Sequence, residues 1–239
     1  MQKNSKGDLY MSRNHIEKVT CPGCGKEADF TVWDSVNITL DPDFKEKVLT
    51  GDPFKFTCPE CGHTTIVNYP VLYHDMENKI MIYFVMSEEG YQAAYDACTF
   101  SGFPETEDNK DLLKAFHENT QDYLYRIVFT QNSLREKINI FDRGKDDRIL
   151  ELMKVFMGGS LQKQQPDLMA FSLYYGYDFN EEFFVVLGKD GILGTVKLPQ
   201  DMYDQLSESL EDKLPDIKDR KTLLINSEWA VEFMKSMDE

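Results

Sequence analysis

The stretch Cys21-Pro22-Gly23-Cys24-Gly25 returns, with one change, as Cys58-Pro59-Glu60-Cys61-Gly62. Two residues between cysteines let both sulfurs reach one metal ion from a single tight turn, and the proline fixes φ in that turn. The glycine after each second cysteine suits the positive φ that directs backbone amides toward the sulfurs. Four thiolates fill a tetrahedral shell and leave no position for water or substrate, which is the arrangement of a structural zinc site. We therefore predict one structural zinc ion with the ligands Cys21, Cys24, Cys58 and Cys61.

Two other chemistries fit the same four cysteines. A tetrahedron of thiolates also suits iron, although zinc is the usual occupant of paired hairpins. A redox dithiol is the main alternative, because a CxxC pair with an acidified first thiol exchanges disulfides. That chemistry favours one CxxC between a strand and a helix, whereas both units here have strand-like flanks.

The segments around the two units alternate in the manner of β-strands. Apolar residues alternate with polar ones from Val36 to Leu40, and 64–67 is β-branched throughout, so each CPxCG unit is expected to join two strands. Between them, Asp41-Pro42 opens a short helical turn that should end at Gly51. The segments 70–74 and 80–85 predict one further hairpin that extends the same sheet.

After Met86 the apolar spacing becomes helical. Tyr91, Ala94 and Cys98 share one helix face, and the acidic segment 101–110 is expected to be a loop. A capping box at 133–136 predicts the start of a second helix, and Asp146 and Asp147 the start of a third.

The C-terminal part is predicted from its turns. Gly158-Gly159-Ser160 is the best candidate for a linker. Gly188-Lys189-Asp190-Gly191 favours a hairpin between 183–187 and 192–198, because Asp-Gly tolerates the positive φ of such turns. Two helices follow, the second capped near Asn226 or Ser227. The aromatic run Phe171–Tyr177 remains without an assigned structure.

Together these patterns predict an α+β fold. N-terminal zinc-ribbon β-hairpins are extended by a further hairpin and followed by helices and a small C-terminal β-hairpin-plus-helix unit. We divide the chain into a domain at 1–158, with a zinc-ribbon β part at 18–86 and a mainly helical part at 87–158, and a small α+β unit at 159–239.

The cysteine motifs and the segments between and after them resemble the CpXC domain family of bacterial proteins, named for paired Cys-Pro-x-Cys units. The resemblance covers about residues 21–154 and rests on the two CPxCG units, WDSVNITLDP, YPVLYHDM and RIVFTQNSLREKINIFDRGKDDRILELMK. It implies a metal-binding domain whose ligands are Cys21, Cys24, Cys58 and Cys61, and it carries over no catalytic residue.

Charge and composition narrow the classes of function. The chain has 239 residues and a formal net charge of −16, which disfavours general binding to nucleic acid or anionic lipid. The longest apolar run, Ile80–Met86, is far shorter than the roughly 20 residues of a transmembrane helix. Five cysteines and an N-terminal sequence unlike a secretory signal favour the reducing cytoplasm.

Three hypotheses of function remain. The first is a non-catalytic module in which zinc fixes a β surface for a protein partner. The second is an enzyme whose pocket lies between the helical and C-terminal parts, with zinc as scaffold. It rests on the chain length and on the unassigned aromatic run Phe171–Tyr177. The third is nucleic-acid binding through a local basic patch on the ribbon, formed by Lys18, Lys26, Lys45, Lys47 and Lys55.

Several single residues have a structural explanation beside a functional one. His63 follows Cys61 closely, but four cysteines already complete the metal shell, so it is expected to be a strand residue. His74-Asp75 fits a hairpin end better than an oriented base, and Cys98 fits the apolar face of its helix. The acidic residues of 142–151 lack the spacing of a calcium loop and fit helix capping.

Overall fold

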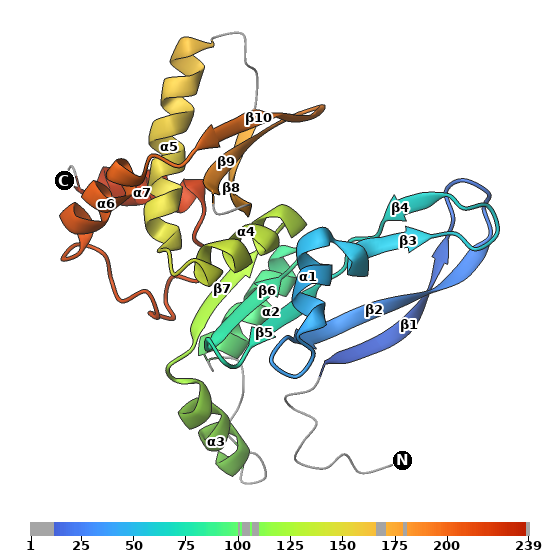
Figure 1. Ribbon diagram of the computed structural model, residues 1–239. Helices are drawn as coiled ribbons and strands as arrows, with labels where there is room; N and C mark the ends of the chain where they lie inside the picture. The colour runs from blue at the N-terminus through green and yellow to red at the C-terminus, as the bar shows by residue number, and fades with distance from the viewer. Residues whose placement is uncertain are drawn as a thin grey trace. The chain divides into compact units, whose positions relative to one another are not determined.

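The computed structural model describes residues 12–99, 101, 106, 110–165, 171–178 and 181–237, and its helices and strands confirm the α+β class (Figure 1). The chain divides into two compact units, Met1–Gln131 and Asn132–Glu239.

One mixed sheet organises the first unit, with the strand order β1-β2-β5-β6-β7. Its strands are β1 (Arg13–Thr20), β2 (Glu27–Asn37), β5 (Val71–Asp75), β6 (Ile80–Phe84) and β7 (Leu124–Val128). The pairs β1–β2 and β5–β6 are antiparallel hairpins, as predicted. β5 joins β2 in parallel, so the further hairpin does extend the same sheet. β7, which the sequence did not indicate, adds to β6 in parallel.

The remaining elements of the first unit lie between these strands in sequence. They are α1 (Asp43–Thr50), the short 3-10 helix η1 (Asp52–Phe54), β3 (Lys55–Thr57), β4 (Thr64–Ile66), α2 (Glu88–Thr99) and α3 (Lys110–Thr120). β3 and β4 form the second cysteine hairpin. α2 packs against β7 and buries Ala94 and Cys98, as their spacing predicted. α3 begins at the end of the segment expected to be a loop.

A long helix, α5 (Asp147–Gln164), forms the centre of the second unit and packs against β8, α6 and α7 (Figure 1). The other elements are α4 (Gln131–Asp142), β8 (Phe171–Asp178), β9 (Glu181–Gly188), β10 (Gly191–Lys197), α6 (Gln200–Leu210) and α7 (Ser227–Met237). The three strands form one antiparallel sheet in the order β10-β9-β8. The predicted hairpin and helices are present, and the aromatic run forms the third strand, β8.

Two local predictions were wrong, a linker at 158–160 and the residues that begin α4. The expected linker Gly158-Gly159-Ser160 lies inside α5, so the predicted boundary at 158/159 falls within a helix, while the compact units meet at 131/132. Packing of α5 on its neighbours offsets the helix penalty of two glycines, roughly 1 kcal/mol each. The capping box predicted at 133–136 does not begin the helix. α4 begins at Gln131, and the carboxylate of Glu136 accepts a hydrogen bond from the backbone amide of Tyr175 instead.

A buried cluster of charged side chains joins α4 to α5. The Lys137 ammonium is 2.8 Å from Asp147 and 3.4 Å from Glu151, and the Lys154 ammonium is 2.7 Å from Glu136 and 2.9 Å from Glu151. All five side chains are at most 6% exposed. Buried charges require such partners because each loses its hydration.

Candidate metal centre

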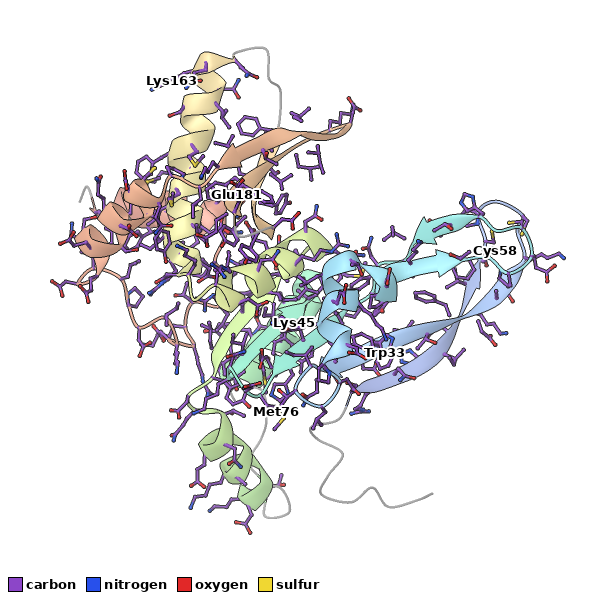
Figure 2. The ribbon with its side chains drawn as sticks, viewed as in Figure 1. Trp33, Lys45, Cys58, Met76, Lys163 and Glu181 are labelled. Atoms are coloured by element: carbon purple, nitrogen blue, oxygen red, sulfur yellow. The ribbon has the colours of Figure 1, made fainter. Side chains whose placement is uncertain are left out.

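Aromatic side chains hold the two cysteine hairpins together. Phe30 on β2 meets Phe56 on β3 edge to face, with ring centroids 6.0 Å apart. Tyr69 packs against Phe30 and Phe54 and donates a hydrogen bond to the carbonyl of Pro53, and burial raises its pKa to about 12. These contacts bring the ends of β1–β2 and β3–β4 to the same place, which Figure 2 marks by the label on Cys58.

The two cysteine turns repeat one backbone geometry. In the first, the Gly25 amide donates to the carbonyl of Cys21 over 2.8 Å. In the second, the Gly62 amide donates to that of Cys58 over 2.9 Å. Gly25 and Gly62 have φ angles of 73° and 72°, which side chains rarely tolerate. Each CPxCG unit is therefore a preformed turn, as the sequence predicted.

The four predicted ligands meet in space. The Sγ atoms of Cys21, Cys24, Cys58 and Cys61 all lie within 4.8 Å of one another, and all five cysteines of the chain are free thiols. Cys21 and Cys61 are 3.7 Å apart at sulfur, and so are Cys24 and Cys58. A metal ion bound at about 2.3 Å to four sulfurs requires edges of about 3.8 Å, so these thiols fit a tetrahedral ion. The Gly23 amide also donates to the Cys21 sulfur.

Their surroundings give the thiols of Cys58 and Cys61 different pKa values. Burial opposes ionisation of Cys58, but hydrogen bonds from the Cys61 and Glu60 amides, and from the Cys21 and Cys24 thiols, outweigh it and lower its pKa to about 7. The His63 amide favours the Cys61 thiolate, yet the neighbouring thiols and burial raise its pKa to about 12. Four thiolates this close repel one another, and a bound cation would relieve that repulsion.

Neighbouring residues join the two turns without entering the group of four thiols. The Lys26 ammonium, after the first turn, pairs with the carboxylate of Glu60 inside the second. His63 is not one of the four close ligands. Its side chain fills the space beside Gly23, where a Cβ atom would lie 3.0 Å from that of His63. The sequence did not indicate these contacts, because each joins residues more than 30 positions apart.

The other candidate residues have structural roles. Asp75 accepts hydrogen bonds from the backbone and side-chain amides of Asn78 and so closes the β5–β6 turn, which confirms the hairpin-end interpretation. His74 is buried beside the Tyr123 hydroxyl. Asp146 caps α5 through the amide of Arg148, whereas Asp147 belongs to the buried charge cluster rather than to a cap.

Comparison with known proteins identifies the family of the chain. A search among curated proteins and a search among solved structures returned no match. Within the described part of the chain, no helix is long and apolar enough to span a membrane. The family model described as "CpXC protein" matches residues 19–154, more than half of the chain, and this range contains both cysteine turns. The chain therefore belongs to the CpXC family.

Proposed function

We propose that the chain is a zinc-binding, non-catalytic protein-interaction module, in which one structural zinc ion fixes the tip of a β-ribbon. The observation that carries this proposal is that the four sulfurs lie within 4.8 Å of one another, with two of the distances between them at 3.7 Å. Cys21, Cys24, Cys58 and Cys61 would hold the ion. Because they fill all four positions, the ion would stabilise structure and would leave no site for substrate.

The ribbon offers exposed surface to a protein partner. Seven of the eight residues of β1 are exposed, as are Thr64 and Ile66 on β4. Ile16 and Ile66 are 59% and 55% exposed, which is unusual for isoleucine. Without metal the two cysteine turns would lose the bonds that join them at the tip, so zinc would stabilise this surface beyond what the aromatic contacts provide.

Two alternatives receive less support. A redox dithiol would place its CxxC at a helix N-terminus, but Cys24 leads into β2 and Cys61 leads into β4. Nucleic-acid binding would need free lysines on the ribbon, but Lys18 pairs with Asp29 and Lys26 pairs with Glu60. We propose a reducing compartment, the cytoplasm, because only reduced cysteines bind zinc.

Metal content and partner capture test the proposal. Protein purified without added metal or chelator should contain about one zinc ion per chain by elemental analysis. A folded chain that contains no metal, or whose paired thiols cycle to disulfides, would contradict the zinc site. Capture with a tagged chain under native conditions should recover one specific protein, either another protein or an untagged copy of the chain, at a near-stoichiometric level, and recovery of neither would contradict the interaction role.

A hollow in the second unit favours a second candidate function, an enzyme with zinc as scaffold. The hollow, of about 330 Å³, is lined by one polar face of α4, including Asn132, Arg135 and Asn139, and by Tyr174 and Phe183 of the sheet. The aromatic run supplies four consecutive residues of the lining, 174–177. A screen of small aromatic acids by amide NMR tests this idea. Shifts centred on 174–177 would support it, and no shift with any compound would count against it.

A further inference from the structure

Strand β1 is a free edge of the five-stranded sheet. Within the described ranges it pairs with β2 alone, so its outer side presents backbone N–H and C=O groups that can pair with another strand. The strand is eight residues long, and only Val19 among them is partly covered. Edges of this length invite strand addition unless their side chains prevent it.

The side chains of β1 limit which strand can be added. Ile16 lies near its middle, directly opposite Thr31 of β2. His15 and Glu17 flank Ile16 and therefore lie on the opposite face of the sheet. The His15 ring is 3.2 Å from the Glu17 carboxylate and 3.3 Å from that of Asp34. A strand that pairs here must supply an apolar residue on one face and hydrogen-bonding partners for His15 and Glu17 on the other.

We propose that this strand is β1 of a second copy of the chain, paired antiparallel about a two-fold axis at Ile16. A two-fold axis perpendicular to the sheet keeps each side chain on its own face. Ile16 then lies opposite Ile16, and His15 of each copy lies opposite Glu17 of the other. Asn14 lies opposite Lys18, and the two five-stranded sheets become one continuous sheet.

The charges select this register over its neighbours. Moving the axis by one residue places His15 against His15 or Glu17 against Glu17, and moving it by two toward the cysteines places Lys18 against Lys18. Glu17 against Glu17 and Lys18 against Lys18 place like charges directly opposite each other, which is destabilising, whereas apolar pairs and a histidine beside a carboxylate acceptor are favourable. Of the axes at 15, 16, 17 and 18, only the axis at Ile16 joins two apolar side chains.

The inference names a partner for the proposed interaction module and rests on that function, because β1 runs directly into Cys21 and needs the ribbon tip to be formed. Metal content is therefore measured on every sample. The metal-loaded wild-type chain should sediment as a dimer, and Ile16→Lys as a monomer. Ile66→Lys is the matched control, since Ile66 is similarly exposed but lies on β4. It should remain dimeric.

Cysteine cross-linking tests the register itself. Ile16→Cys should form a disulfide-linked dimer on mild oxidation, whereas Lys18→Cys alone should not. Lys18→Cys mixed with Asn14→Cys should form the heterodimer. A wild-type monomer with full metal content, or a dimer that survives Ile16→Lys, would overturn this inference and leave the zinc module standing. A folded chain without metal would overturn the proposed function instead.

Discussion

Replacing Cys61 by serine isolates the contribution of one ligand to the proposed zinc site. Cys61 is exposed and Cys58 is buried, so Cys61→Ser changes the ligand with little effect on packing. The other three sulfurs would remain, because Phe30 and Phe56 hold the two hairpins together independently of Cys61. We expect weaker metal binding and a ribbon tip that opens more easily.

The expected loss of metal affinity can be estimated from the number of sulfur ligands. Structural zinc contributes roughly 10–16 kcal/mol in isolated zinc-finger peptides. Divided among four sulfurs, this gives about 2.5–4 kcal/mol for each, or a loss of roughly 10²- to 10³-fold in metal affinity. Cys61→Ser removes the sulfur that lies 3.7 Å from that of Cys21 in the intact site.

Competition with a chromophoric chelator measures the affinity, and hydrogen exchange measures the opening of the tip. The amides of Cys21 and Cys58, which donate to the carbonyls of Lys26 and His63, should exchange faster in Cys61→Ser. Cys98→Ala is the control, because Cys98 is a buried thiol in α2 outside the group of four. Unchanged affinity in Cys61→Ser, or metal loss in Cys98→Ala, would refute the reasoning.

Three further predictions concern stability. Lys137→Met should lower the free energy of unfolding by about 3–5 kcal/mol in urea titration, because it removes the ammonium 2.8 Å from the buried Asp147 carboxylate; a loss below about 1 kcal/mol would contradict this. Burial lowers the pKa of His74 from 6.5 to about 4, against the opposing effect of Asp75, so the unfolded chain takes up this proton at higher pH than the folded chain. The free energy of unfolding should therefore decline as the pH falls from 6.5 to about 4, by up to about 3 kcal/mol. His74→Gln should make this decline smaller. Gly62→Ala should lower the free energy of unfolding by about 1–2 kcal/mol through the positive φ alone, since no atom lies within 4 Å of the added Cβ. A thermal unfolding midpoint equal to that of the wild type would count against this prediction.

Several elements could be predicted because their signals are local. The CPxCG turns depend on proline and glycine within five residues, and both turns have the expected backbone geometry. The β5–β6 and β9–β10 hairpins also depend on short turns between strand-like segments. Asn226 caps α7 through the amide of Trp229, as the sequence indicated.

The missed elements depend on distant partners. β7 carries Arg126 among apolar residues, so its pattern does not resemble a buried strand, yet it pairs in parallel with β6 more than 40 residues earlier. β8 is an exception, because it is an aromatic run that pairs with β9, the next strand in the sequence. Gly158 and Gly159 lie within α5, whose packing against β8, α6 and α7 joins separate elements of the chain.

By itself the sequence determined the α+β class, the family and the four candidate ligands, because turn chemistry and cysteine spacing act over a few residues. Only the tertiary structure decided that the four sulfurs meet within 4.8 Å, since they lie on two hairpins that are joined by contacts such as that between Phe30 and Phe56. It also decided that β1 is an edge strand and that Lys137 and Lys154 are buried with carboxylates. Strand order joins residues far apart in the chain, and these ion pairs join two different helices, so local sequence patterns contain no record of such contacts.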